Sequence, residues 1–202
     1  MLVSVVNLKC SNCGESLAES MSRCPSCDQP VVIKKMSSLF GVPPAELNMR
    51  WRLMDRARLE EQDNDLVSDA DFTAGCCFLR LKMFDRAMMR FDKTVTLNPG
   101  NADAFFCMAV SALKGKRPFL VPLADIRKAH ESLDAAVMIE ERAIFRLFLA
   151  YVKYDFFARR FLQIEPDWQT ELLSAVALGL TDEDVDELFT ALGQACPKEL
   201  LG

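Results

Sequence analysis

Two pairs of cysteines with the same short spacing constrain this chain more than any other feature. The first pair reads Cys10-Ser-Asn-Cys13 and the second reads Cys24-Pro-Ser-Cys27, with ten residues between the pairs. A tight turn lets two thiolates approach one ion, and its backbone amides can donate to the sulfurs. Two such pairs supply all four ligands of a tetrahedron and leave no open position for water or substrate. The spacing therefore predicts a structural metal site.

The doubled motif lies within residues 1–35 and resembles a zinc ribbon. The resemblance implies zinc as the bound ion, with iron or a redox role for the same thiolates as the alternatives. A segment of this length buries too little apolar surface to fold unaided, whereas zinc binding supplies about 10–16 kcal/mol. Zinc ribbons serve contacts with nucleic acid, ribosomes, polymerases or proteins. This one is only slightly basic, since Lys9, Arg23, Lys34 and Lys35 are offset by acidic neighbours.

The charge balance and the histidine count exclude several classes of function. The chain has 202 residues, 29 Asp and Glu against 24 Lys and Arg, and a formal net charge of −5. Affinity for a phosphate backbone requires an excess of Lys and Arg, so a nucleic-acid partner is disfavoured. The single histidine excludes a histidine metal triad, and it allows Ser-His or Cys-His catalysis only if His130 is the base. The composition favours a binding protein over an enzyme.

The distribution of apolar residues predicts a cytoplasmic protein without a membrane span. The longest apolar stretch, residues 143–157, is interrupted by Arg146, Lys153 and Asp155. Residues 1–8 are apolar but carry no basic region of the kind that opens a secretory signal. In the reducing cytoplasm we do not expect the eight cysteines to form a disulfide framework.

A linker and an amphipathic helix are expected over residues 36–64. Ser, Gly and Pro residues mark the linker, and Pro44 suits the first turn of a helix that extends to about Gln62. One apolar stripe of this helix consists of Leu47, Trp51, Met54 and Ala57. Arginine and acidic residues, Arg50 among them, are assigned to the other, solvated face.

The remaining residues, 65–202, are expected to be almost entirely helical and to contain an internal repeat. When the sequence is aligned with itself, Asp69-Ala70-Asp71-Phe72 matches Asp103-Ala104-Phe105-Phe106, and Leu79 matches Leu113. A repeat length of about 34 residues with two helices per unit resembles the tetratricopeptide repeat. In the first unit the matching positions are Gly75, Phe78, Phe84, Ala87, Phe91 and Pro99, whereas Asp71 departs from the preferred Trp.

The resemblance implies a mainly α fold, a solenoid of about three helix pairs. The second pair continues with Ala129, Leu133 and Ala136 after an enlarged turn around residues 116–122, which shifts this helix by about eight residues. A third pair is expected from about residue 141 to Pro166. A final helix, opened by a capping-box pattern at Thr181 and ended by Gly193, is interpreted as the cap of the array.

Repeats of this family bind partners along a concave groove that is lined by the first helix of each unit. Transferred to this chain, the groove positions are Asp69, Phe72, Cys76, Leu79 and Arg80, then Asp103, Phe106, Val110, Leu113 and Lys114. The two phenylalanines would anchor apolar groups, and the two basic residues would bind a carboxylate of a peptide. The alternative is that the chain covers this groove itself, with the helix around Trp51 or with the C-terminal helix.

These features lead to three hypotheses of function. The first is a non-enzymatic adaptor that binds a protein or peptide segment in the groove and carries a structural zinc ribbon; dimerisation is compatible with it. The alternative is a protein whose ribbon contacts nucleic acid, a ribosome or a polymerase while the repeats recruit a partner. The third is a redox switch or enzyme built on the adjacent Cys76 and Cys77, for which core packing is the simpler interpretation.

Overall fold

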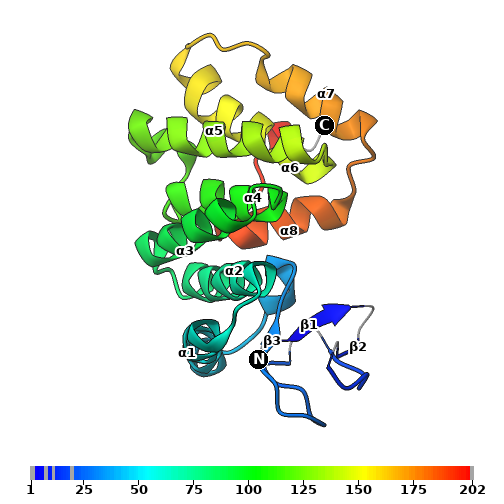
Figure 1. The fold of residues 1–202 in the computed structure, drawn as a ribbon. Coiled ribbons are helices and arrows are strands. Elements are labelled where there is room, and N and C mark those ends of the chain that lie inside the picture. Colours follow the sequence, from blue (N-terminus) through cyan, green and yellow to red (C-terminus); the bar gives the residue numbers. More distant parts are fainter. Residues whose placement is uncertain (1–2, 7–8, 11, 19–20, 201–202) are drawn as a thin grey trace. The chain divides into compact units, whose positions relative to one another are not determined.

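The computed structural model describes residues 3–6, 9–10, 12–18 and 21–200 and is mainly helical (Figure 1). Eight α-helices and three short strands are present in this described part of the chain. The chain divides into two compact units, residues 1–107 and 108–202. The cysteine-rich segment therefore belongs to the same unit as the first helices and is not a compact unit of its own.

A small sheet opens the first unit. Its strands are β1 (Val3–Val6), β2 (Lys9–Cys10) and β3 (Val31–Val32), in the order β2-β1-β3. β1 pairs with β2 in antiparallel register and with β3 in parallel register. Val31 and Val32 are fully buried. The sheet thus connects the first cysteine pair to the segment that follows the second.

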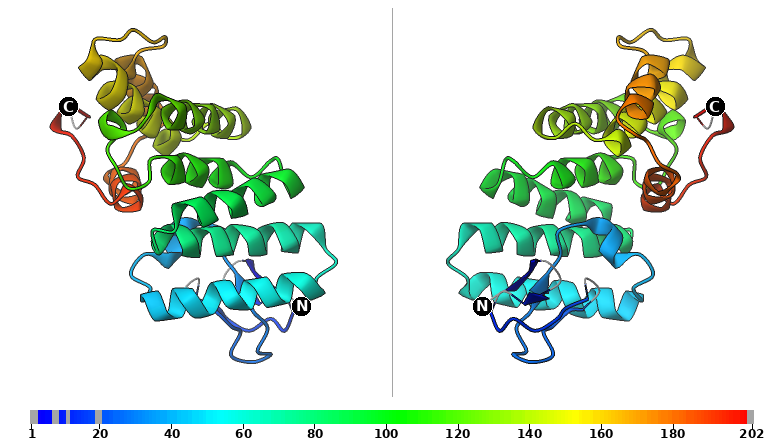
Figure 2. Two further views of the ribbon diagram at one scale, coloured as in Figure 1. Left: turned by 90° about the vertical axis from the view of Figure 1, so that its left-hand side faces the viewer. Right: turned by 90° about the vertical axis from the view of Figure 1, so that its right-hand side faces the viewer.

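Three helices follow the sheet within the first unit. A 3-10 turn, η1 (Met36–Leu39), leads into α1 (Pro44–Glu60), which starts at the predicted proline and ends two residues before the predicted limit. Next come α2 (Asn64–Arg80) and α3 (Phe84–Leu97). α2 packs against both α1 and α3, and Figure 2 shows α1 and α2 running alongside each other in both views.

Small residues allow α2 and α3 to approach closely, as the repeat pattern predicts. A Cβ atom on Gly75 would lie 2.6 Å from Cε1 of Phe91, so only glycine fits here. Phe72 also contacts Phe91, with ring centroids 5.9 Å apart. The aromatic side chains therefore fill the space around a contact that a larger residue would block.

Asp71, the predicted departure from the repeat pattern, links three helices. Its carboxylate is buried and accepts hydrogen bonds from Arg90 of α3 at 2.6 Å and Arg58 of α1 at 3.4 Å. Arg90 also pairs with Asp55 of α1. A buried carboxylate needs such partners because desolvation penalises its charge. At this buried position, charge pairing therefore connects the helices where apolar packing was expected.

Equivalent positions of the internal repeat are buried alike in α2 and in α4 (Ala102–Ala112), the helix that crosses residue 107. The equivalent buried pairs are Ala70 and Ala104, Phe72 and Phe106, and Leu79 and Leu113. The buried small and large residues of α3 likewise correspond to those of α5 once the predicted insertion is allowed for. These are Ala87 and Ala129, and Phe91 and Leu133.

The second unit contains the elements from the enlarged turn onward. They are η2 (Pro118–Leu120), α5 (Leu123–Ile139), α6 (Ala143–Val152), the π-helical turn η3 (Lys153–Phe157), η4 (Ala158–Arg160), α7 (Trp168–Ala177), α8 (Asp182–Leu192) and η5 (Lys198–Leu200). α6 contacts α5, α7 and α8, and every residue of α6 except Arg146 is buried. α6 is therefore the central helix of this unit.

A buried ion pair ties the end of α6 to α7. Lys153 donates to Glu171 at 2.6 Å and to the carbonyl of Pro166 at 2.8 Å, and Arg146 donates to the same glutamate at 2.9 Å. The predicted third pair, residues 141 to Pro166, contains only α6 and the irregular turns η3 and η4; its partner helix, α7, begins at Trp168, beyond the predicted limit.

The final helix matches the sequence prediction at both ends. Thr181 and Asp184 form a reciprocal capping box, and Gly193 ends the helix in the left-handed conformation. Leu188, Phe189 and Leu192 are buried along one face. Among the described helices of the chain, none is long and apolar enough to cross a bilayer.

Candidate metal centre and predicted groove

The four cysteines of the two predicted knuckles converge on one point. The Sγ atoms of Cys10, Cys13, Cys24 and Cys27 all lie within 4.8 Å of one another. The Cys10–Cys27 and Cys13–Cys24 pairs are 3.8 and 3.5 Å apart. Four sulfurs placed about 2.3 Å from a tetrahedral ion are separated by about 3.8 Å. The donor set therefore fits a single soft or borderline ion.

The two knuckles repeat the same backbone structure, the first starting at Cys10 and the second at Cys24. The amide of Cys10 donates to the carbonyl of Glu15, and the amide of Cys24 donates to the carbonyl of Gln29. In the opposite direction, the amide of Gly14 donates to the carbonyl of Cys10 and the amide of Asp28 donates to the carbonyl of Cys24, each at 2.9 Å. Gly14 and Asp28 both have a positive φ, 76° and 57°. Each turn thus presents its cysteines in the same way.

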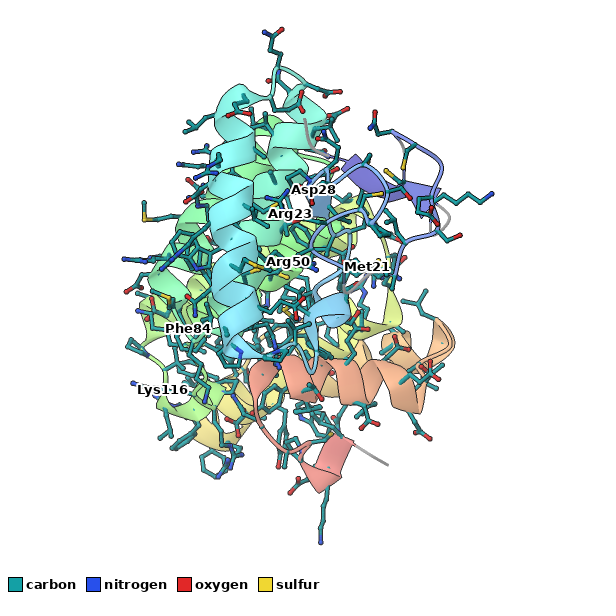
Figure 3. The ribbon with its side chains drawn as sticks, turned by 90° about the horizontal axis from the view of Figure 1, so that it is seen from below. Met21, Arg23, Asp28, Arg50, Phe84 and Lys116 are labelled. Carbon is teal, nitrogen blue, oxygen red and sulfur yellow. The ribbon has the colours of Figure 1, made fainter. Side chains whose placement is uncertain are left out.

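Side chains on the rim hold the two knuckles together. The Ser26 hydroxyl of the second knuckle donates to the carboxylate of Glu15, beside the first knuckle, at 2.6 Å. This hydrogen bond is the main reason that the pKa of Glu15 is lowered. Arg23 donates to the side chain and the carbonyl of Asp28, which lies next to it in Figure 3. These bonds fix both turns, and beneath them Leu17 and Val31 pack against buried cysteines.

The thiols differ in their affinity for protons. Hydrogen bonds from the Asn12 side chain and then from the Gln29 backbone lower the pKa of Cys27 to about 6. The backbone hydrogen bond at Glu15 lowers the pKa of Cys13, but desolvation and its hydrogen bonds to the other three thiols outweigh this and raise that pKa to about 12. An ion that binds here must therefore displace a proton from Cys13.

The face of α2 that was predicted to be an open groove is covered by the chain's own residues 31–40. The amide of Ile33 donates to Oγ1 of Thr73 at 2.9 Å, and Lys34 forms an ion pair with Asp69. Burial raises the pKa of Asp69, and Lys34 opposes this effect. Met36 and Leu39 are buried, and η1 and β3 both contact α2. We call residues 31–40 the strap.

The strap corrects the prediction for the first row of groove residues. Phe72, Cys76 and Leu79 are buried, and Asp69 has only 7% of its surface exposed. Arg80 is half-buried, and its guanidinium stacks on the Phe40 ring, 5.1 Å from the centroid. The strap precedes the helix around Trp51, so it is a cover that the sequence did not predict. That helix instead packs on α2 through the Trp51 and Phe78 rings, whose centroids are 5.1 Å apart.

The second row of predicted groove residues is also mostly buried. Phe106, Val110 and Leu113 are inaccessible, and Asp103 is half-buried. Lys114 is exposed, but its ammonium lies 3.6 Å from the carboxylate of Asp125. These positions therefore do not form an open row of side chains.

The adjacent cysteines Cys76 and Cys77 are both fully buried. Burial raises the pKa of Cys76 and brings that of Cys77 to about 12, against an opposing effect of Arg50. Buried thiols with raised pKa values react slowly, so this environment favours the packing interpretation. Cys107 lies against Met36 of the strap, with the two sulfurs 3.9 Å apart.

Two features were missed from the sequence. Arg50 was assigned to a solvated face, but it is fully buried, and desolvation lowers its pKa. Its position three residues after Leu47 and four before Met54, both buried, places it on the apolar stripe of α1 and could have shown this. The docking of the strap on α2 left no local signal, because it depends on contacts between distant residues.

No family model matches this chain, and no curated protein matches it. The assignment of function therefore depends on the geometry described above.

Proposed function

We propose that this protein is a non-enzymatic adaptor in which tetratricopeptide-like helix pairs hold a segment of a protein partner and a zinc ribbon stabilises the first pair. Zinc is proposed as the ion of the four-cysteine site. Four thiolates would complete its tetrahedron, so its role would be structural.

The observation that carries this proposal is the way α2 binds the strap. A segment made of the strand β3 and the 3-10 turn η1 lies on the helix through one backbone amide, one ion pair and two buried apolar side chains, those of Met36 and Leu39. Helix-lined surfaces recognise peptides with the same combination of polar and apolar contacts. The fold is thus suited to holding a chain segment, and in the first unit it already holds one.

Charge argues against the rival hypothesis, that the ribbon binds nucleic acid. Of the four basic residues of the ribbon, Arg23 pairs with Asp28 and Lys34 pairs with Asp69. The formal charge of the whole chain is −5. Few cations remain to displace counterions from a phosphate backbone.

Two measurements on the full-length, zinc-loaded protein test the proposal. Filter binding to RNA and DNA oligonucleotides at low and high salt measures affinity for nucleic acid. Photo-crosslinking in lysate, followed by reconstitution of the complex from purified components, measures binding to protein. We expect a stoichiometric complex with one protein and no retention of nucleic acid that depends on salt. Retention that falls steeply with salt, without a reconstituted protein complex, would favour the rival.

A further inference from the structure

The second unit carries a basic and apolar surface. It is formed by residues 116–128 and 155–160, which together contain six Lys and Arg but only two Asp in a chain of net charge −5. Among the described residues, Arg127, Lys128 and Lys116 form no ion pair, and Lys116 points outward in Figure 3. Local charge is therefore opposite in sign to the charge of the whole chain.

Contacts around Phe119 hold the two segments of this surface in place. Arg160 donates to the Phe119 carbonyl, and the Phe119 amide donates to the buried carboxylate of Asp155 at 2.9 Å. Arg117 and Arg159 both bind that same carboxylate. The guanidinium groups of Arg159 and Arg160 also stack on the Phe119 ring. One carboxylate between two arginines leaves an excess of positive charge.

Large apolar side chains are exposed on the same segments and just after them. Leu120 is 66% exposed, Leu123 45%, Leu162 50% and Phe161 96%. Phe161 also has a positive φ of 57°, a conformation that disfavours a side chain as large as phenylalanine. Neither burial nor local backbone preference explains a phenylalanine at this position. Exposed apolar clusters of this kind mark interaction sites.

A pocket of about 450 Å³ opens beside these side chains, between α5 and residues 157–164. Leu123, Phe157, Leu162 and Ile164 form its apolar lining, and Arg127, His130 and Glu131 supply polar groups. Nδ1 of His130 lies 2.9 Å from Asp134, whereas its Nε2 is buried without a hydrogen-bond partner in the described structure. A buried nitrogen of this kind needs a partner when the pocket is filled.

We propose that this surface binds an acidic peptide segment that carries bulky apolar side chains, supplied by a protein partner. The proposal rests on the adaptor function and names where and what the adaptor binds. An apolar side chain would fill the pocket, carboxylates would pair with Arg127 and its basic neighbours, and a backbone group would satisfy His130. A lipid tail offers no such hydrogen bond.

The test uses peptides selected from a random display library on the full-length protein. We expect the enriched sequences to combine Asp or Glu with Leu, Phe or Trp. The dissociation constant of a synthetic, fluorescein-labelled copy is then measured by fluorescence polarisation. Leu162→Ser and Arg127→Glu should each weaken binding about tenfold, the size of effect expected at a central contact. Leu173→Ser and Lys93→Glu change an exposed leucine and an exposed lysine elsewhere and should leave the affinity unchanged.

Two further readouts separate a binding role from a structural one. Phe161→Gly should weaken binding without lowering the thermal midpoint, because glycine adopts a positive φ readily. His130 is the single histidine of the chain, so its Cε1 proton gives one NMR signal, which should shift when the peptide binds.

Several results would overturn the proposal. Enriched peptides that bind all variants equally would place the site elsewhere, while leaving the adaptor function intact. Failure to enrich any peptide, or selection of basic peptides, would reject the surface as an acidic-peptide site. Binding to phosphatidylserine vesicles or to polyuridine RNA that depends on Leu162 and Arg127, without peptide binding, would assign the surface to a membrane or to nucleic acid. If the surface bound a membrane or nucleic acid, the adaptor function would depend only on the protein complex that is reconstituted after photo-crosslinking.

Discussion

Gly75 and Phe91 show how a single atom decides whether two helices can pair. The Phe91 ring occupies the space where any other residue at position 75 would place its Cβ. The sequence pattern predicted this small residue, because the spacing of small and aromatic residues encodes close helix packing. Arg50 illustrates the opposite case. Arg50 was expected to be solvated because it is charged, but its position on the apolar stripe of α1 determines its burial.

Gly75→Ala tests the close approach of α2 and α3. The added methyl group would lie 2.6 Å from a fully buried ring. Because the core is closely packed, we expect the free energy of unfolding to fall by about 1–3 kcal/mol. Urea denaturation followed by circular dichroism measures this change.

Gly100→Ala is the matched control for this prediction. The nearest atom to its new Cβ would be Oδ1 of Asn98 at 3.4 Å, in a turn between helices. Its effect should stay within about 0.5 kcal/mol, as for most surface substitutions. Equal stability of the two variants would show that the Phe91 ring can move aside, contrary to the packing described here.

At the scale of elements, local signals predicted the helices well and failed to predict what covers them. Pro44 opens α1, Thr181 and Asp184 cap α8, and the internal repeat relates buried positions in α2 and α4. These signals depend on residue types and their spacing along the chain, so the sequence displays them. The position of the strap depends on contacts such as that between Ile33 and Thr73, forty residues apart. No local pattern distinguishes such a segment from a linker.

Leu39→Ala tests whether the strap stabilises the first unit. Leu39 is fully buried, so its truncation would leave a cavity where the strap meets the helices. We expect a loss of about 2–5 kcal/mol in the free energy of unfolding, measured by loss of helical circular dichroism in urea. Leu59→Ala, at an 80% exposed position of α1, serves as the control and should have little effect. If the two variants unfolded at the same urea concentration, the strap would contribute nothing to helix stability.

At the scale of the whole molecule, the metal ligands were predictable and the partner surface was not. The four cysteines come together as their spacing predicts, because each knuckle is a local structure repeated once. The prediction of an open groove was wrong for most of its residues. The resemblance to a repeat indicates where a groove can form, but it does not indicate whether other residues of the chain fill it. The surface around Phe119 and Phe161 was missed because it depends on contacts between distant residues, such as Phe119 and Arg159, forty positions apart.

The metal content of the purified protein tests the central claim most directly. Elemental analysis by mass spectrometry should find one zinc per chain, and X-ray absorption at the zinc edge should find four sulfur ligands at about 2.3 Å. Cys10→Ser should lose the metal, whereas Cys196→Ser, outside the site, should keep it. A chain that folds without metal, or zinc bound through nitrogen or oxygen ligands, would contradict the account.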